Sequence, residues 1–371
     1  MHTTLPAIEI FKHLHENPEL SFQEFKTTDY IKEVLSAEEI EILPLPLKTG
    51  LVARVRGEKA GKKIAFRADI DALPIEEKNA LPYRSKHTGI MHACGHDIHT
   101  TVAIETARIL QHNRNKLRGE VLFVFQPAEE AGNGAFEILN THVLEGTDAI
   151  FSLHTSPVLE VGEIGIKEGA ITAAVDILSI KITGRGAHGA QPQDGRDPIV
   201  ASAAIITALQ SIVARNISPF RQAVVSITRI TGGSSWNIIP SDVLLEGTVR
   251  TTDNALRDFI AKRIHHIVEQ TACAYDETAQ VSITTGPPAT NNDKTLADYA
   301  WQMAQKLNFK PVRPEVTMVG EDFAHYQSMY KGIMVWLGVG KTHALHSPEF
   351  QADPEAIAVG TQYFSELLMN K

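Results

Sequence analysis

The chain is poor in cysteine, in aromatic residues and in long apolar runs. Its two cysteines, Cys94 and Cys273, are too few for a disulfide framework in 371 residues, which favours a reducing cytoplasm. Aromatic residues, 6% of the chain, do not cluster, and there is no run of Lys or Arg, so nucleic acid is not expected as a partner. No apolar stretch approaches the roughly 20 residues of a membrane helix. The segment Met1–Pro6 lacks the basic and apolar regions of a signal peptide. We therefore expect a cytoplasmic protein without a membrane partner.

What the chain has is enough apolar residues for a large core and many histidines. Hydrophobic residues make up 43% of the sequence, and the length suggests two domains. The net charge is -9, from 35 basic and 44 acidic residues. Several of the 16 histidines lie in three of the four short stretches described below.

The two ends of the chain alternate between strand-like and helical segments. Helical periodicity from Ala7 to Ala37 is interrupted near Asn17-Pro18. Further segments predict strands at Leu51–Arg56, Lys63–Ala68, Val121–Phe125, Ala149–Leu153 and Met334–Val339, and helices at Asp97–Gln111, Gly134–His142, Thr295–Leu307 and Pro354–Asn370. Alternation of this kind indicates an α/β domain with a largely parallel sheet flanked by helices.

The middle of the chain has a different rhythm. Strand patterns at Asp176–Thr183, Ala223–Ile230, Leu244–Thr251 and Gln280–Thr284 are combined with helical patterns at Pro198–Arg215 and Ala255–Tyr275. The order β-α-β-β-α-β is that of a ferredoxin-like α+β domain. We therefore predict that residues 1–175 and 288–371 form one α/β domain and that residues 176–287 form a small α+β domain inserted into it.

Four short stretches concentrate metal-binding side chains. They are Met91–His99, Gln126–Glu130, Leu153–Thr155 and Leu345–Pro348. Thiolate, imidazole and carboxylate together suit one or two divalent transition metals, with one carboxylate left to act as a base. In open α/β sheets ligands bind beyond the carboxyl ends of the strands, and most of these stretches follow a predicted strand. The sequence therefore predicts a metal-dependent hydrolase.

Taken singly, each of these residues has a plainer interpretation. Cys94 alone is more often a small buried residue, and Glu129-Glu130 alone is more often a solvated loop. His154 or His346 alone is more often a capping or core histidine. The roles of His92 and His99 stay open between orienting a ligand and packing at the start of a helix.

A series of longer motifs resembles one family nearly end to end. The motifs are Leu14–Phe22, Arg67–Pro74, His92–Asp97, Phe125–Glu130, Gly186–His188, Trp236–Pro240, Leu245–Arg250, Gly320–Phe323 and His346–Phe350. In this order they resemble the M20 metallopeptidase family, and within it the aminoacylase and hippurate hydrolase type of amidohydrolase. The chain is most similar to bacterial deacetylases of small N-acetylated amino acids, of the N-acetylcysteine type.

The resemblance implies two divalent metal ions per subunit, with Mn, Zn, Ni and Co all open. The residues that match the family's ligand positions are Cys94, His96, Glu130, His154 and His346. Cys94 stands where many members have a bridging aspartate. Glu129 matches the general base, and Asp71 matches the aspartate that orients a ligand. Asp69 stands where other branches carry a metal-binding histidine, so its role stays open.

The resemblance also implies that residues 1–175 and 288–371 form the metal-binding catalytic domain and that residues 176–287 form a lid or dimerisation domain with catalytic and substrate-binding residues. His188, Asn237 and Arg250 match residues that contact the substrate, and in related homodimers the partner subunit can supply them. The implied reaction is hydrolysis of an N-acyl, in particular N-acetyl, amino acid to a carboxylate and the free amino acid. A dipeptidase or carboxypeptidase with the same chemistry is the nearest alternative. A non-catalytic metal-dependent binding protein is the alternative of another class.

Overall fold

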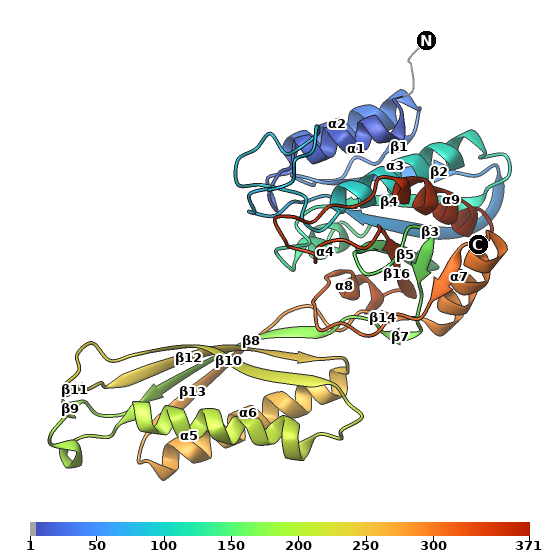
Figure 1. Ribbon diagram of the computed structural model, residues 1–371. Helices are drawn as coiled ribbons and strands as arrows, with labels where there is room; N and C mark the ends of the chain where they lie inside the picture. The colour runs from blue at the N-terminus through green and yellow to red at the C-terminus, as the bar shows by residue number, and fades with distance from the viewer. Residues whose placement is uncertain (1–4) are drawn as a thin grey trace. The chain divides into compact units, whose positions relative to one another are not determined.

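A computed structural model describes residues 5–371 and divides them into two compact units (Figure 1). The first comprises the chain up to Ile171 together with Thr290–Glu315 and Asp322–Lys371, and the second comprises Thr172–Ala289 and Val316–Glu321. Residues 1–4, which begin the N-terminal segment considered above, lie outside the described part. The sequence places residues 316–321 in the catalytic domain, but in the structure they belong to the second unit. The amide of Ala173 donates to the carbonyl of Val319 at 3.0 Å and ties this segment to the beginning of that unit.

The first unit contains an eight-stranded sheet and most of the helices. Its helices are α1 (Ala7–Glu16), α2 (Phe25–Ala37), α3 (His96–His112), α4 (Gly134–Leu139), α7 (Lys294–Lys306), α8 (Phe323–Gln327) and α9 (Glu355–Met369). Its strands are β1 (Glu41–Ile42), β2 (Leu51–Arg56), β3 (Lys59–Asp69), β4 (Arg118–Gln126), β5 (Ala149–Ser156), β6 (Glu163–Gly165), β7 (Gly169–Ala170), β14 (Asn291–Asn292), β15 (Lys310–Val312) and β16 (Gly332–Gly338). Strands β7 and β14 pair with each other in a separate two-stranded ladder.

The large sheet is mixed, with order β1-β2-β4-β3-β5-β16-β6-β15. The four central strands β4, β3, β5 and β16 are parallel, whereas β2 is antiparallel to β4 and β6 is antiparallel to β16. The prediction of a largely parallel sheet is therefore correct only for its centre. The connection of two residues, Gly57-Glu58, is too short for a crossover helix, so the chain reverses between β2 and β3.

Alternating apolar residues bury both faces of this sheet. In β4, Val121, Phe123 and Phe125 join a core cluster with α1, α2, α3, α7 and α9, whereas Leu122 and Val124 join a second cluster with α4 and α8. Successive side chains of a strand point to opposite faces, so a continuous apolar run is what a sheet covered on both sides requires. The large α/β unit that the sequence predicts is thus present as a mixed sheet flanked by helices (Figure 1).

The second unit contains a four-stranded antiparallel sheet. Its elements are β8 (Ala174–Thr183), β9 (Ala187–His188), η1 (Pro192–Asp194), α5 (Pro198–Ser211), the π-helical turn η2 (Ile212–Asn216), β10 (Ala223–Gly232), β11 (Ile238–Ile239), β12 (Asp242–Thr251), α6 (Asn254–Ala274) and β13 (Thr278–Thr285). The strand order is β10-β12-β8-β13, with every neighbouring pair antiparallel. Helices α5 and α6 share a core cluster with these strands, as a β-α-β-β-α-β order requires.

Contrary to the prediction from the sequence, one helical segment approaches the length and hydropathy of a membrane span. Pro198–Asn216, 19 residues with a mean hydropathy of 1.5, is long and apolar enough to cross a membrane by length and composition alone. Ala201, Ile205 and Leu209 of this segment are buried in the core of the second unit. Core helices pass the same test, so the segment is weak evidence for a membrane span.

Candidate metal centre

The parallel centre of the large sheet gathers the predicted ligands at one edge. Asp69 ends β3, Glu129 and Glu130 follow β4, and His346 lies in the chain after β16. His154 lies inside β5, which continues to Ser156 instead of ending at Leu153 as predicted. Because β3, β4, β5 and β16 are parallel neighbours, their carboxyl ends meet at the same edge.

The five predicted ligands form two groups that share Cys94. The donor atoms of Cys94, His96 and His154 lie within 4.8 Å of one another, and so do those of Cys94, Glu130 and His346. The Sγ atom of Cys94 is 3.5 Å from Nε2 of His154, and Oε1 of Glu130 is 3.2 Å from Nε2 of His346. The structure therefore brings all five residues together, with Cys94 common to both groups.

Backbone carbonyls fix the orientation of two histidines in this cluster. Nδ1 of His96 lies 2.9 Å from the carbonyl oxygen of Asp71, and Nδ1 of His154 lies 2.9 Å from that of Thr155. A carbonyl oxygen only accepts, so Nδ1 of each ring donates and Nε2 is directed to the cluster. Nε2 of His96 is buried and has no hydrogen-bond partner among residues 5–371. This orphaned atom is what a metal ligand presents when its ion is removed.

The electrostatics of the cluster also fit cations. Burial lowers the pKa of His96, but the charge of Asp69 and the hydrogen bond to Asp71 outweigh it and raise that pKa to about 10. Burial, together with the charges of Glu130 and Glu129, raises the pKa of the Cys94 thiol well above its ordinary value. A coordinating thiol is deprotonated by its metal, so the thiolate form at this position depends on a bound cation. The residues present thus fit divalent metal ions.

Asp71 contacts both ligand groups. Its Oδ2 accepts hydrogen bonds from the hydroxyl of Ser21 at 2.7 Å and from the amide of Glu130 at 3.0 Å. Its Oδ1 lies 3.3 Å from Nδ1 of His96. Asp71 is 1% exposed, so these contacts are shielded from water. Its position fits a residue that orients ligands and does not itself bind the metal.

Glu129 lies beside the two groups that share Cys94. One of its oxygens is within 4.8 Å of donor atoms of His96 and Glu130, and its Oε1 lies 3.4 Å from the amide nitrogen of Asp322. The residue is 8% exposed. The carboxylate of Glu129 is thus buried next to the ligand groups and accepts a long hydrogen bond from the backbone N–H of Asp322.

The structure answers part of what the sequence leaves open about Asp69, His99 and His92. Asp69 accepts from Nη1 of Arg67 at 2.6 Å and from Nδ1 of His99 at 2.5 Å, and Nε2 of His99 accepts from the amide of Thr155 at 2.8 Å. The donor atoms of Asp69, His96 and His99 also lie within 4.8 Å of one another. However, the contacts just described already occupy both oxygens of Asp69 and both ring nitrogens of His99. His92 is buried, which lowers its pKa to about 4, and it belongs to neither group that shares Cys94.

Sequence reasoning missed several buried polar residues around the centre. Arg67, fully buried, also donates to Gln126 at 2.9 Å and to Asp322 at 2.7 Å. His15 lies 2.6 Å from Asp97, the residue after the ligand His96. The motifs that carry the family resemblance contain all three residues, Arg67, Asp322 and His15. Membership in these motifs was the one sign in the sequence that they support the site.

In the second unit the structure brings His188 and Asn237 together and separates them from Arg250. His188 of β9 pairs with Ile238 of β11, next to Asn237. Arg250 lies near the other end of β12, eight residues beyond Asp242, which at about 3.3 Å per residue is roughly 26 Å along the strand. Nη1 of Arg250 donates to the hydroxyl of Thr248 at 2.6 Å.

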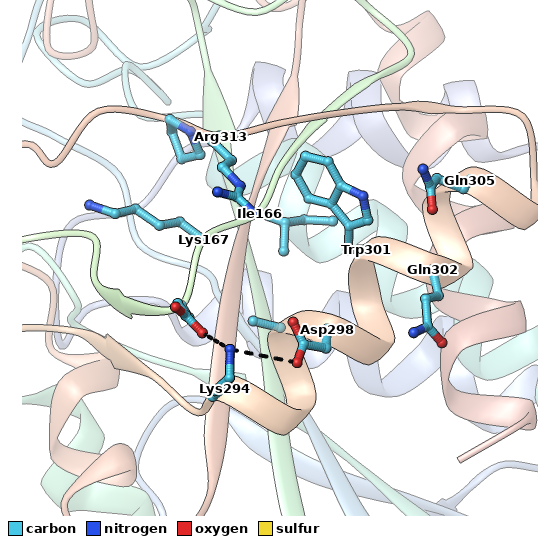
Figure 2. Close-up of a pocket in the computed structure, with 11 residues that line it drawn as sticks. Ile166, Lys167, Lys294, Asp298, Trp301, Gln302, Gln305 and Arg313 are labelled. Carbon is cyan, nitrogen blue, oxygen red and sulfur yellow. Dashed lines mark hydrogen bonds and ion pairs between the residues drawn. The ribbon is translucent and has the colours of Figure 1, made fainter.

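A separate cavity of about 560 Å³ in the first unit is shown in Figure 2. Its lining contains none of the candidate ligands. Lys294 pairs there with Glu168 at 2.5 Å and with Asp298 at 3.9 Å, and the guanidinium of Arg313 lies over the ring of Trp301 (Figure 2). These contacts are local ion pairing and stacking, so the candidate site stays at the sheet edge.

Comparison with known proteins gives the family. The description "Peptidase family M20/M25/M40" matches residues 65–370, and the chain belongs to this family. It is 47% identical to an N-acetylcysteine deacetylase of Bacillus subtilis over 99% of this chain and 96% of that protein. It is 38% identical to an N-acetyldiaminopimelate deacetylase of Pediococcus pentosaceus over 99% of this chain and 97% of that protein.

A solved structure agrees with these relatives. The crystal structure of a dinuclear metal binding peptidase of the M20 family from Bacillus subtilis superposes with a TM-score of 0.90 at 43% identity, over 98% of this chain and 96% of that one. The predictions of the M20 family and of a hydrolase that acts on amide bonds are thus confirmed.

Proposed function

We propose that the protein is a metal-dependent amidohydrolase that removes the acyl group, in particular acetyl, from N-acylated amino acids. The observation that carries this proposal is the pair of ligand groups that share Cys94, with Glu129 beside them. Relatives that span nearly the whole chain are named deacetylases of N-acetylcysteine and N-acetyldiaminopimelate. Their names support the class of substrate and leave the side chain of the amino acid open.

Two divalent ions would be held by these groups. Cys94, His96 and His154 would hold one ion, and Cys94, Glu130 and His346 would hold the other. When bound, such ions lower the pKa of a water molecule and polarise the carbonyl of the amide. Sulfur favours softer ions such as zinc, while Mn, Ni and Co also remain compatible with these ligands.

Glu129 would transfer the proton in this reaction. Its carboxylate removes a proton from the attacking water as the oxygen bonds to the carbonyl carbon. The same carboxyl group then gives the proton to the amide nitrogen as the C–N bond breaks. The products are the carboxylate of the acyl group and an amino acid with a free amine. The backbone N–H of Asp322, which lies 3.4 Å from Oε1 of Glu129, would orient the base.

Three residues of the second unit would act on the substrate. Nδ1 of His188 accepts from the amide of Ala190 at 3.1 Å, which leaves its Nε2–H to donate to the carbonyl oxygen. Asn237, beside His188, would add a polar contact to the substrate. The guanidinium of Arg250 would pair with the amino acid's carboxylate.

We also propose a homodimer formed through the second unit. Large apolar side chains are exposed there, among them Phe220 and Trp236, each 96% exposed, and Val200 at 49%. A dimer interface on this unit would cover such side chains. His188 lies in the separate two-stranded ladder of β9 and β11, which precedes β12, and Arg250 lies near the far end of β12. This separation favours a site that combines Arg250 of one subunit with the partner subunit's His188. Both cysteines are free, which supports a cytoplasmic location.

The test is a substrate panel on the metal-free protein reloaded separately with Mn, Zn, Co or Ni. We expect turnover of N-acetyl amino acids and much slower cleavage of dipeptides with a free amino terminus. Preferential cleavage of dipeptides would identify a dipeptidase instead. Tight metal binding without turnover of any substrate in the panel would support a binding protein.

A further inference from the structure

Glu129 and Glu130 follow a residue with a rare backbone conformation. Ala128 has φ of 54°, in the left-handed region that residues other than glycine seldom adopt. It is fully buried and directly precedes the two carboxylates. Residues keep such a conformation only where the surrounding structure fixes it, and they gather at functional sites. Contacts with the surrounding structure must therefore hold Ala128 in this conformation.

The side chain of Glu24 makes one of these contacts from a distant part of the chain. Its Oε1 accepts the backbone N–H of Ala128 at 2.8 Å across 104 residues of sequence. Glu24 is fully buried, and burial raises the pKa of its carboxyl group. A buried polar group without a hydrogen-bond partner is costly, so this contact gives a reason for an acceptor oxygen at this position.

Other backbone groups of the same turn are also bonded. The carbonyl of Ala128 accepts from Gly134 at 3.2 Å, and that of Glu129 accepts from Gly132 at 2.7 Å. A Cβ atom added to Gly134 would lie 1.8 Å from the carbonyl oxygen of Pro127, so the turn closes tightly on itself. The amide of Glu130 donates to Asp71. Among these contacts, Glu24 is the one made by a side chain to Ala128 itself.

We propose that Glu24 is a positioning residue that holds Ala128 in its left-handed conformation and so aims Glu129 and Glu130 at the metal centre. This inference rests on the proposed function for the roles of those two carboxylates. It predicts that the two metal sites respond differently to loss of Glu24, because the turn supplies a ligand to only one of the two groups. Glu130 belongs with Cys94 and His346, whereas Cys94, His96 and His154 come from other segments.

The experiment measures zinc binding to the full chain by competition with a chromophoric chelator. Removing a residue that orients a ligand typically costs about 10- to 100-fold in metal affinity. We expect Glu24→Ala to weaken one of two zinc sites by about tenfold or more and to leave the other unchanged. Glu24→Gln, whose amide oxygen can still accept from Ala128, should bind both ions nearly as the parent protein does.

Two further variants separate positioning from general stability. Glu19→Ala is a matched control, because Glu19 accepts from the amide and hydroxyl of Thr27 at 2.8 and 2.9 Å, in the same segment but away from the turn. It should leave both zinc affinities unchanged. In the Glu24→Ala background, Ala128→Gly should restore part of the lost affinity, because glycine adopts positive φ without the steric cost.

Parental affinity at both sites in Glu24→Ala would overturn the inference. Equal weakening of both sites, or the same loss in Glu19→Ala, would also overturn it, since either result assigns Glu24 to general stability. Because zinc binding is measured without substrate, an inactive parent protein would refute the proposed function and leave this test intact. If the parent is active, kcat of Glu24→Ala should fall by about 10- to 100-fold and recover in Glu24→Gln.

Discussion

The Sγ atom of Cys94 lies 3.5 Å from Nε2 of His154, and the same cysteine belongs to a second group with Glu130 and His346. A single thiol thus stands between two sets of nitrogen and oxygen donors. The loop that carries Cys94 is also bonded to the strand that carries His154, because the hydroxyl of Thr155 donates to the carbonyl of Cys94 at 2.7 Å. The proposed centre of two metals depends on this relationship.

Oxidation of Cys94 should inactivate the enzyme, and bound metal should slow the loss. The thiol is 5% exposed and has a raised pKa without a cation, so we expect peroxide to react with it slowly in the metal-free protein. Two bound ions would hold the electron pairs of the sulfur that attack peroxide, so we expect the reaction to be slower still in the metal-loaded protein. The measurement follows activity and free thiol together. Cys273, which is exposed, provides the internal control through Cys273→Ser. Unchanged activity and metal content in Cys94→Ala would contradict a ligand role.

Glu129→Gln should lower kcat by about 10²- to 10⁴-fold with metal content near that of the parent. The amide keeps the shape of the side chain but cannot take a proton from water. Glu130→Gln is the matched comparison in the adjacent position, and it should lose metal affinity. Metal analysis of both variants after gel filtration decides between them. If Glu129→Gln loses metal and Glu130→Gln keeps it, the two roles are exchanged.

His188→Ala should reduce kcat by about 10²- to 10³-fold without a change in zinc affinity or thermal stability. A hydrogen bond that strengthens as charge develops on the carbonyl oxygen acts on the transition state, so its loss falls on kcat. His266→Ala, on the exposed surface of α6, is the control and should behave as the parent. Parental kcat in His188→Ala would make the residue a surface histidine only.

Mixing two inactive variants tests whether His188 acts across the dimer. If His188→Ala and Glu129→Gln proteins regain partial activity after subunit exchange, each site combines residues of two subunits. Proven exchange without recovery would place His188 within its own chain.

The stability of the protein should depend on pH through His15. Burial lowers the pKa of His15, but hydrogen bonds to Asp97 and Glu77 outweigh it and raise that pKa from 6.5 to about 9. The folded state therefore binds a proton more tightly than the unfolded state. The contribution of protonated His15 to the free energy of unfolding is complete below pH 6.5 and is lost as the pH rises through about 9.

Urea unfolding of the metal-free protein from pH 6 to pH 10 measures this effect against His15→Gln. The free energy of unfolding of the parent should fall more steeply than that of the variant between pH 6.5 and 9. Parallel curves for the two proteins across this window would show that His15 is not protonated in the folded state.

The sequence predicts those parts of the metal centre that follow a recognisable local pattern, such as an apolar strand. The apolar runs of β4 and β5 indicate buried strands, and Glu129, Glu130 and His154 lie at or near their carboxyl ends, which gives the sheet edge without knowledge of contacts. The antiparallel strand β6 of three residues is too short to show a period, so the sheet was expected to be more parallel than it is.

The supporting residues could not be predicted in the same way, because their partners are distant in sequence. Arg67 and Asp322 are separated by 255 positions, and a charged side chain considered alone is expected at the surface. The contact of Glu24 with Ala128, and the positive φ of Ala128, depend on tertiary packing that no local pattern encodes.

The most direct test of the central claim is a crystal structure of the zinc-loaded protein with anomalous data collected on both sides of the zinc absorption edge. We predict two anomalous peaks, each about 2.3 Å from Sγ of Cys94, one beside His96 and His154 and the other beside Glu130 and His346. A single peak, or two peaks of which either lies beyond bonding distance of Cys94, would contradict a centre of two metals bridged by this cysteine.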